Sequence, residues 1–114
     1  MKHHFEKNLK IINELMTYLH KLKATDINVN MKRFDTNTHF HIWGNISGID
    51  SDELEKLNEI LNTNRQHEVE EYYWNLGGEG EADGELSLIG MMIDSVEISY
   101  SNNILTFDIN RNDF

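Results

Sequence analysis

The sequence predicts an α+β fold, a two-layer sandwich in which two helices pack on one face of an antiparallel sheet. Three observations predict it. Apolar residues recur with helical spacing in two segments, they alternate with polar residues in several others, and short turns join two pairs of alternating segments. The predicted order is α-β-β-α-β-β-β-β, with two hairpins plus one or two further strands, in a single domain over residues 1–114. A ferredoxin-like arrangement is the nearest alternative.

The first predicted helix covers residues 5–22. Its apolar side chains recur at spacings of three and four, which places them on one face of a helix. They are Phe5, Leu9, Ile12, Leu15, Met16, Leu19 and Leu22. Lys7, Lys10, Glu14 and Lys21 fall on the other side of this helix, which we expect to face solvent.

Residues 26–47 change to a period of two, which is typical of half-buried strands on either side of a turn. The apolar positions of this alternation are Ile27, Val29, Met31, Phe40, Ile42 and Ile46. We expect Phe34 to lie opposite His39 and Lys32 opposite His41, because this register places every aliphatic side chain on one face of the hairpin.

The second predicted helix begins after Asp50. Asp50 can cap the helix and Glu53 can reach back, in the manner of a capping box. Ile49 and Leu54 are spaced to form a hydrophobic staple across that start. Leucine and isoleucine continue the apolar stripe as far as Leu61, and the polar run 62–64 ends the helix.

Residues 68–93 are predicted to form two more strands, 68–76 and 85–93, around an acidic, glycine-rich loop at 77–84. The carboxylates that start at Glu79 resemble the first half of an EF-hand calcium loop. The bidentate glutamate of that loop is replaced by Gly90, so a hydrated hairpin loop is the better prediction.

The chain closes with a second hairpin across the turn at Asn102 and Asn103. One register brings all six apolar residues to one face, namely Val96, Ile98, Tyr100, Leu105, Phe107 and Ile109. The same register places Glu97 opposite Asp108, and two carboxylates in that position are a cation site, a catalytic dyad or a pair of solvated side chains. We expect the solvated pair.

The charge balance restricts the classes of partner. Twenty acidic residues against ten basic ones give a net charge of −10, which argues against nucleic acid because such affinity comes from clustered Lys and Arg. No stretch is apolar enough to span a membrane, so we expect no membrane association and a cytoplasmic protein. The abundance of Asn and Ile suggests a bacterial source. The chain has no cysteine, which excludes disulfides and thiolate chemistry.

The segment His39-Phe40-His41 places two imidazoles on the same face of a strand. Two histidines at this spacing can bind one metal ion, but a metal site needs a third donor and the neighbouring sequence offers none. No triad of nucleophile, base and acid can be identified, and Ser47 lies outside the motif that such a nucleophile needs. We therefore assign no catalytic residue and no cofactor.

Aromatic and imidazole side chains gather on the outer face of the predicted sheet. The predicted set is Phe34, His39, His41, Trp43, Val69 and Tyr73. Exposed aromatic clusters with a polar rim are typical of binding surfaces. The alternative is a second core, in which other segments cover this face.

These features predict a small, non-enzymatic interaction module of the inhibitor, immunity or adaptor type. It would bind a protein partner, or a second copy of itself as a homodimer, through the outer face of the sheet. The acidic body favours a basic partner and a salt-sensitive association. The alternative function is metal binding by His39 and His41.

Overall fold

Four helices and four strands form the computed structural model, which describes residues 3–74 and 82–113. In chain order they are α1 (His4–Lys21), β1 (Ile27–Arg33), β2 (Asn37–Asn45), α2 (Ser51–Leu61), α3 (His67–Tyr73), α4 (Ala82–Gly90), β3 (Ser95–Ser101) and β4 (Ile104–Asn112). The predicted α+β class is confirmed. The predicted order is wrong between α2 and β3, where two helices take the place of two strands.

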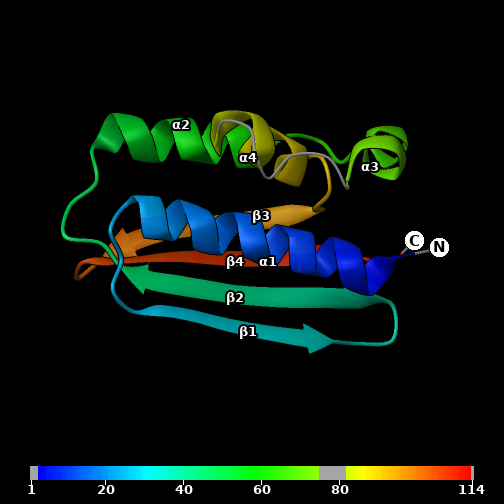
Figure 1. Cartoon of the computed structure of the whole chain (residues 1–114), viewed down its shortest axis with the longest axis horizontal. Helices are drawn as coiled ribbons and strands as arrows, with labels where there is room; N and C mark the ends of the chain where they lie inside the picture. The colour runs from blue at the N-terminus through cyan, green and yellow to red at the C-terminus, as the bar shows by residue number, and fades with distance from the viewer. Residues whose placement is uncertain (1–2, 75–81, 114) are drawn as a thin grey trace.

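All four strands form one antiparallel sheet in the order β1-β2-β4-β3. The two long strands β2 and β4 are central, and β1 and β3 are the edges. Figure 1 shows α1 in front of β4 and β2, with α2 and α4 toward the β3 side. Side chains from α1, α2 and α4 share one core with the strands, which includes Leu15, Leu57, Ile89 and Phe107.

The first hairpin has the predicted faces but a different register. Lys32 pairs with His39 rather than with His41, and the amide of Phe34 donates to the carbonyl of Asn37 over 2.7 Å. The turn is therefore centred on Asp35 and Thr36, one residue earlier in the chain than the predicted register requires. A shift of two residues leaves every side chain on the same face, so the polarity pattern could not detect it.

The second hairpin has the predicted register. Tyr100 pairs with Leu105, Val96 with Ile109, and Glu97 with Asp108. Asn102 and Asn103 take positive φ angles of 52° and 61°, which a two-residue hairpin turn requires and asparagine tolerates.

The strands predicted at 68–76 and 85–93 are wrong. Residues His67–Tyr73 form α3, and residues Ala82–Gly90 form α4. In α3, closely spaced glutamates disfavour a strand, and Glu70 is buried. In α4, the buried Leu86 and Ile89 are three residues apart, which is a helical spacing. Residues 75–81, which include the end of the first of these predicted strands and most of the predicted loop at 77–84, lie outside the described residues.

The buried side of α1 is rotated from the predicted one. Lys7 and Glu14, which we expected in solvent, are buried, while Phe5, Leu9 and Met16 are exposed. The predicted buried side of this helix depended on the spacing of apolar residues alone. The buried side includes charged residues because Lys7 and Glu14 have partners inside the molecule.

The start of α2 is confirmed at Asp50, but the predicted capping box is wrong. Asp50 makes no side-chain capping bond. Glu53 instead accepts a hydrogen bond of 2.7 Å from the hydroxyl of Tyr18, which ties α2 to α1. No helix among the described residues is both long enough and apolar enough to cross a membrane.

Candidate partner-binding surface

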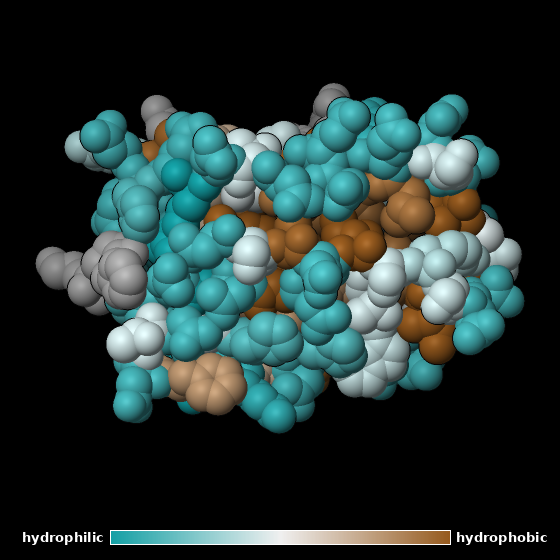
Figure 2. Space-filling model, turned by 180° about the vertical axis from the view of Figure 1, so that it is seen from behind, coloured by the Kyte–Doolittle hydropathy of each residue, from teal (hydrophilic) through white to brown (hydrophobic). Residues whose placement is uncertain are grey.

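The side of the sheet opposite α1 is the open face. Its side chains alternate with the buried ones on each strand, as β2 shows, where Phe40 and Ile42 are fully buried and His39, His41 and Trp43 are partly exposed. The open face consists of Asn28, Asn30, Lys32, His39, His41, Trp43, Ser95, Glu97, Ser99, Thr106, Asp108 and Asn110. Figure 2 views the molecule from behind and shows this side as mainly hydrophilic, with hydrophobic side chains reaching the surface toward α2 and β3.

Asp108 lies at the centre of the open face. It pairs with His41 on one side and with Glu97 on the other. Its carboxylate accepts a hydrogen bond of 2.5 Å from Nδ1 of His41, and Nε2 of His39 lies 3.8 Å from the same oxygen. The two histidines and the carboxylate are each partly exposed, so the cluster is open to solvent.

A ring pair lies beside this cluster. The His41 and Trp43 ring centroids are 4.7 Å apart, with the planes tilted by 46°. These two rings, together with Asn30, Lys32 and His39, line a shallow hollow of about 440 Å³. The hollow on the open face is therefore lined on one side by the rings of His41 and Trp43, and it contains one cationic residue, Lys32.

Three of the six predicted surface residues come together as expected. His39, His41 and Trp43 line the same hollow. Phe34 is 56% exposed beside the turn that joins β1 and β2, outside that hollow. Val69 and Tyr73 belong to α3 and not to the sheet, so their assignment to this face was wrong, because it depended on a strand that does not exist.

Asp108 was missing from the predicted surface. In the sequence it is 67 residues from His41, and only the pairing of β2 with β4 joins them. Even with Asp108 present, the described residues contain no group of three or more His, Asp or Glu side chains arranged to hold a metal ion. The structure thus adds no support for a site at His39 and His41.

A second charged cluster lies inside the molecule and is centred on Glu70 of α3, which is fully buried. Arg111 donates two hydrogen bonds to its carboxylate, over 2.9 and 2.8 Å. Lys7 donates over 3.0 Å and Arg65 over 3.2 Å. This buried cluster joins α1, α3, β4 and the segment between α2 and α3.

The electrostatics of the buried cluster favour the ionised glutamate. Burial by itself raises the pKa of Glu70, but the hydrogen bonds and charge of Arg111, with those of Lys7 and Arg65, outweigh it and lower the pKa to about 2. The two outer carboxylates are Glu71, which accepts from Lys7, and Asp94, which accepts from Arg65. Three cations thus meet three anions, so each charged side chain of the cluster has a partner of opposite charge.

Sequence reasoning missed the buried cluster, although one signal was present. Leu105, Phe107 and Ile109 alternate on the buried face of β4, and Arg111 is the next residue in that alternation. A charged residue at an inward position indicates a buried partner. The identity of the partner, Glu70, could not be inferred, because it lies on an element that the sequence analysis assigned as a strand.

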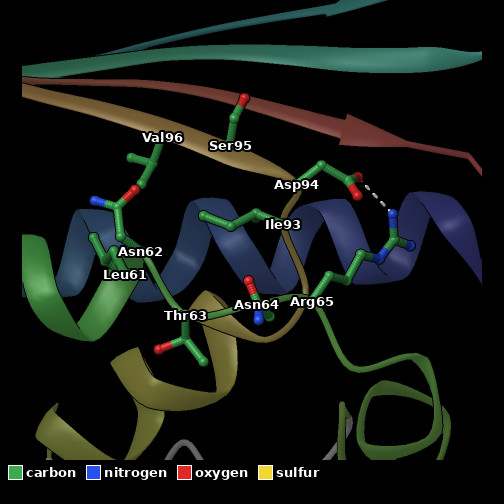
Figure 3. A pocket seen from close by; sticks show the side chains of 9 residues that line it. All are labelled: Leu61, Asn62, Thr63, Asn64, Arg65, Ile93, Asp94, Ser95 and Val96. Carbon is green, nitrogen blue, oxygen red and sulfur yellow. Dashed lines mark hydrogen bonds and ion pairs between the residues drawn. The ribbon is translucent and has the colours of Figure 1, made fainter.

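A further hollow of about 280 Å³ lies between the end of α2 and the start of β3. Figure 3 shows its lining, in which Arg65 and Asp94 are joined across one end by an ion pair of 2.7 Å. The other polar side chains of the lining are Asn62, Thr63, Asn64 and Ser95. Its one cation is already paired, so the hollow offers no free charge for catalysis.

Comparison of the sequence with protein-family models, and with curated protein sequences, finds no match.

Proposed function

We propose that this chain is a non-enzymatic protein–protein interaction module, of the inhibitor, immunity or adaptor type, that binds its partner through the open face. The observation that carries the proposal is the His41–Trp43 ring pair at the edge of a shallow hollow. Tryptophan is enriched among the residues that dominate binding energy, because it buries a large area at a low cost in conformational entropy.

The chemistry of the hollow supports a protein ligand. Amide, ammonium and imidazole groups from Asn30, Lys32 and His39 surround the indole, which is the combination of an apolar anchor and a polar rim that protein interfaces use. A partner side chain that enters the hollow would contact the indole and donate to, or accept from, that rim.

The charge of the chain supports a partner with a basic surface. The net charge is −10, and Asp108 and Glu97 lie side by side on the open face. Complementary charge speeds the encounter and is screened by salt, so binding should weaken as the ionic strength rises. We further propose a cytoplasmic setting in a bacterial cell, for which the support is compositional.

The test is affinity capture from cells that express the protein, with wild type and Trp43→Ala compared at low and high salt. Truncating a tryptophan anchor costs about 2 kcal/mol, so we expect Trp43→Ala to retain the partner about 30-fold more weakly. The matched control is Tyr72→Ala, which removes an aromatic side chain that is 77% exposed on α3, away from the sheet. Equal retention by wild type and Trp43→Ala would contradict the proposal.

A further inference from the structure

An apolar surface with no described element over it runs along α1 and the edge strand β1. We call it the apolar margin, and it consists of Phe5, Leu9, Ile12 and Met16 on α1 with Ile27, Val29 and Met31 on β1. Among the described residues, seven large hydrophobic side chains are exposed, and four of them belong to this margin. They are Phe5 at 52%, Leu9 at 45%, Met16 at 39% and Val29 at 38% exposed.

The helical part of the margin points away from the other helices. Phe5, Leu9 and Met16 are four and seven residues apart, so they form one ridge along α1. Lys7 and Tyr18, which bond α3 and α2, lie roughly 160–180° around the helix from Leu9, at 100° per residue. The ridge is therefore on the β1 side of α1.

The part of the apolar margin on β1 belongs to the face of the sheet on which α1 packs, but no described helix covers it. Val29 pairs with Ile42, which is fully buried, yet Val29 itself is exposed, and its neighbours Ile27 and Met31 are only partly buried. Figure 1 shows β1 at the lower margin of the sheet, with no helix drawn in front of it. The apolar face of β1 is therefore covered less completely than that of the neighbouring β2.

We infer that a second copy of the chain docks on the apolar margin, with α1 of each copy lying over β1 of the other. Each chain carries both a helical ridge and an uncovered strand, and a two-fold axis lets each ridge cover the partner's strand. This inference concerns a different surface from the open face and does not depend on the proposed function.

The area of the margin is suited to a dimer. At roughly 150–200 Å² for a large apolar side chain, the four exposed residues present roughly 300 Å². A standard interface buries about 800 Å² on each partner, of which about 450–520 Å² is apolar. Phe5, Leu9, Met16 and Val29 alone thus supply more than half of the apolar area required, and the partly buried Ile12, Ile27 and Met31 add to it.

The distribution of charge permits this contact. Seventeen of the twenty acidic residues lie in residues 35–114, whereas α1 and β1 lie in residues 1–34. Two copies that meet at the margin therefore do not oppose their acidic surfaces. Because the contact is apolar, we expect the dimer to persist at high salt, in contrast to binding at the open face.

The experiment measures the mass of the full chain in solution by size exclusion with light scattering, over a wide range of concentration and at low and high salt. Wild type is expected at the mass of two 13.4 kDa chains. Leu9→Glu and Val29→Lys place a charge in each half of the apolar contact and should raise the dissociation constant by about 100-fold or more. Wild type at the mass of one chain at every concentration would overturn the inference.

The matched control is Ile104→Glu, which puts the same charge at a 40% exposed residue of β4 outside the margin. We expect it to remain dimeric. Circular dichroism and thermal unfolding of each variant establish that the fold is kept, as expected for side chains that are exposed in one copy. A dimer that survives Leu9→Glu and Val29→Lys unchanged would place the contact elsewhere and overturn the inference.

Discussion

Arg111 and Glu70 face each other in the interior and are joined by two parallel hydrogen bonds, 2.9 and 2.8 Å long. Both side chains are fully buried. Arg111 also donates to the main-chain carbonyl of Met92 over 2.6 Å. The pair ties α3, which is short, to the end of β4. Removing either partner would leave the other as an uncompensated buried charge.

Replacement Glu70→Gln should destabilise the protein by about 3–5 kcal/mol, because it leaves the guanidinium of Arg111 buried without a matching anion. Urea unfolding followed by circular dichroism measures the change. The control is Glu68→Gln, an exposed position on the same helix, which should change the stability by less than about 0.5 kcal/mol. Similar midpoints for the two variants would show that the buried cluster does not hold the fold.

The stability of the wild type should fall as the pH decreases from about 4.5 to about 2. The pKa of Glu70 is about 2 in the folded protein and 4.5 for the unperturbed group. The unfolded chain therefore binds the proton first, so this contribution is complete above pH 4.5 and is lost as the pH falls through the folded pKa.

The size of this contribution is about 3 kcal/mol. Other carboxylates also titrate in this range, so the measurement is the difference between wild type and Glu70→Gln in urea unfolding across the pH range. That difference should shrink toward pH 2. A difference that does not depend on pH would contradict the low pKa of Glu70.

Substitution Gly90→Ala should destabilise the contact between α4 and α2. A Cβ atom at residue 90 would lie 2.5 Å from the carbonyl oxygen of Ile60, so the two helices must move apart. Overpacking of this kind costs about 1–3 kcal/mol. Thermal unfolding measures it, with Gly48→Ala as the control, because a Cβ at residue 48 meets nothing within 4 Å. Equal effects of the two substitutions would refute the close approach.

Replacement Glu97→Gln should stabilise the protein by about 0.2–1 kcal/mol, because Glu97 lies directly opposite Asp108 in the β3–β4 pair. Urea unfolding of the single variants and of the double variant with Asp108→Asn completes the cycle. The gain should vanish when Asp108 is already neutral. A gain of the same size in both backgrounds would mean that the two carboxylates do not interact.

The sequence determined the features that depend on local periodicity. The alternation of polar and apolar residues predicted which side chains lie on each face of β2, β3 and β4. The asparagine pair at the second turn indicated the register of the second hairpin. The start of α2 after Asp50 followed from the residue types preferred there. His39, His41 and Trp43 were placed on one face because alternate residues of a strand always share a face.

Tertiary contacts decided the rest. The register of the first hairpin differs by two residues, a shift that polarity cannot detect. Residues 67–73 form a helix, and the Glu70 carboxylate on it has partners on α1 and β4 that are distant in the sequence. The charge of Lys7 predicted a solvent-exposed side chain, and its burial is explained by the carboxylates of Glu70 and Glu71, which are 63 and 64 residues away in the sequence.

The sequence by itself therefore determined which residues share a face of a strand or helix. Backbone geometry repeats every two residues in a strand and every 3.6 residues in a helix, whatever the surroundings. Only the folded molecule decided which charges meet, because ion pairs form between elements that are distant in sequence, and their energy depends on burial. Asp108 beside His41, and Arg111 beside Glu70, are both contacts of this second kind.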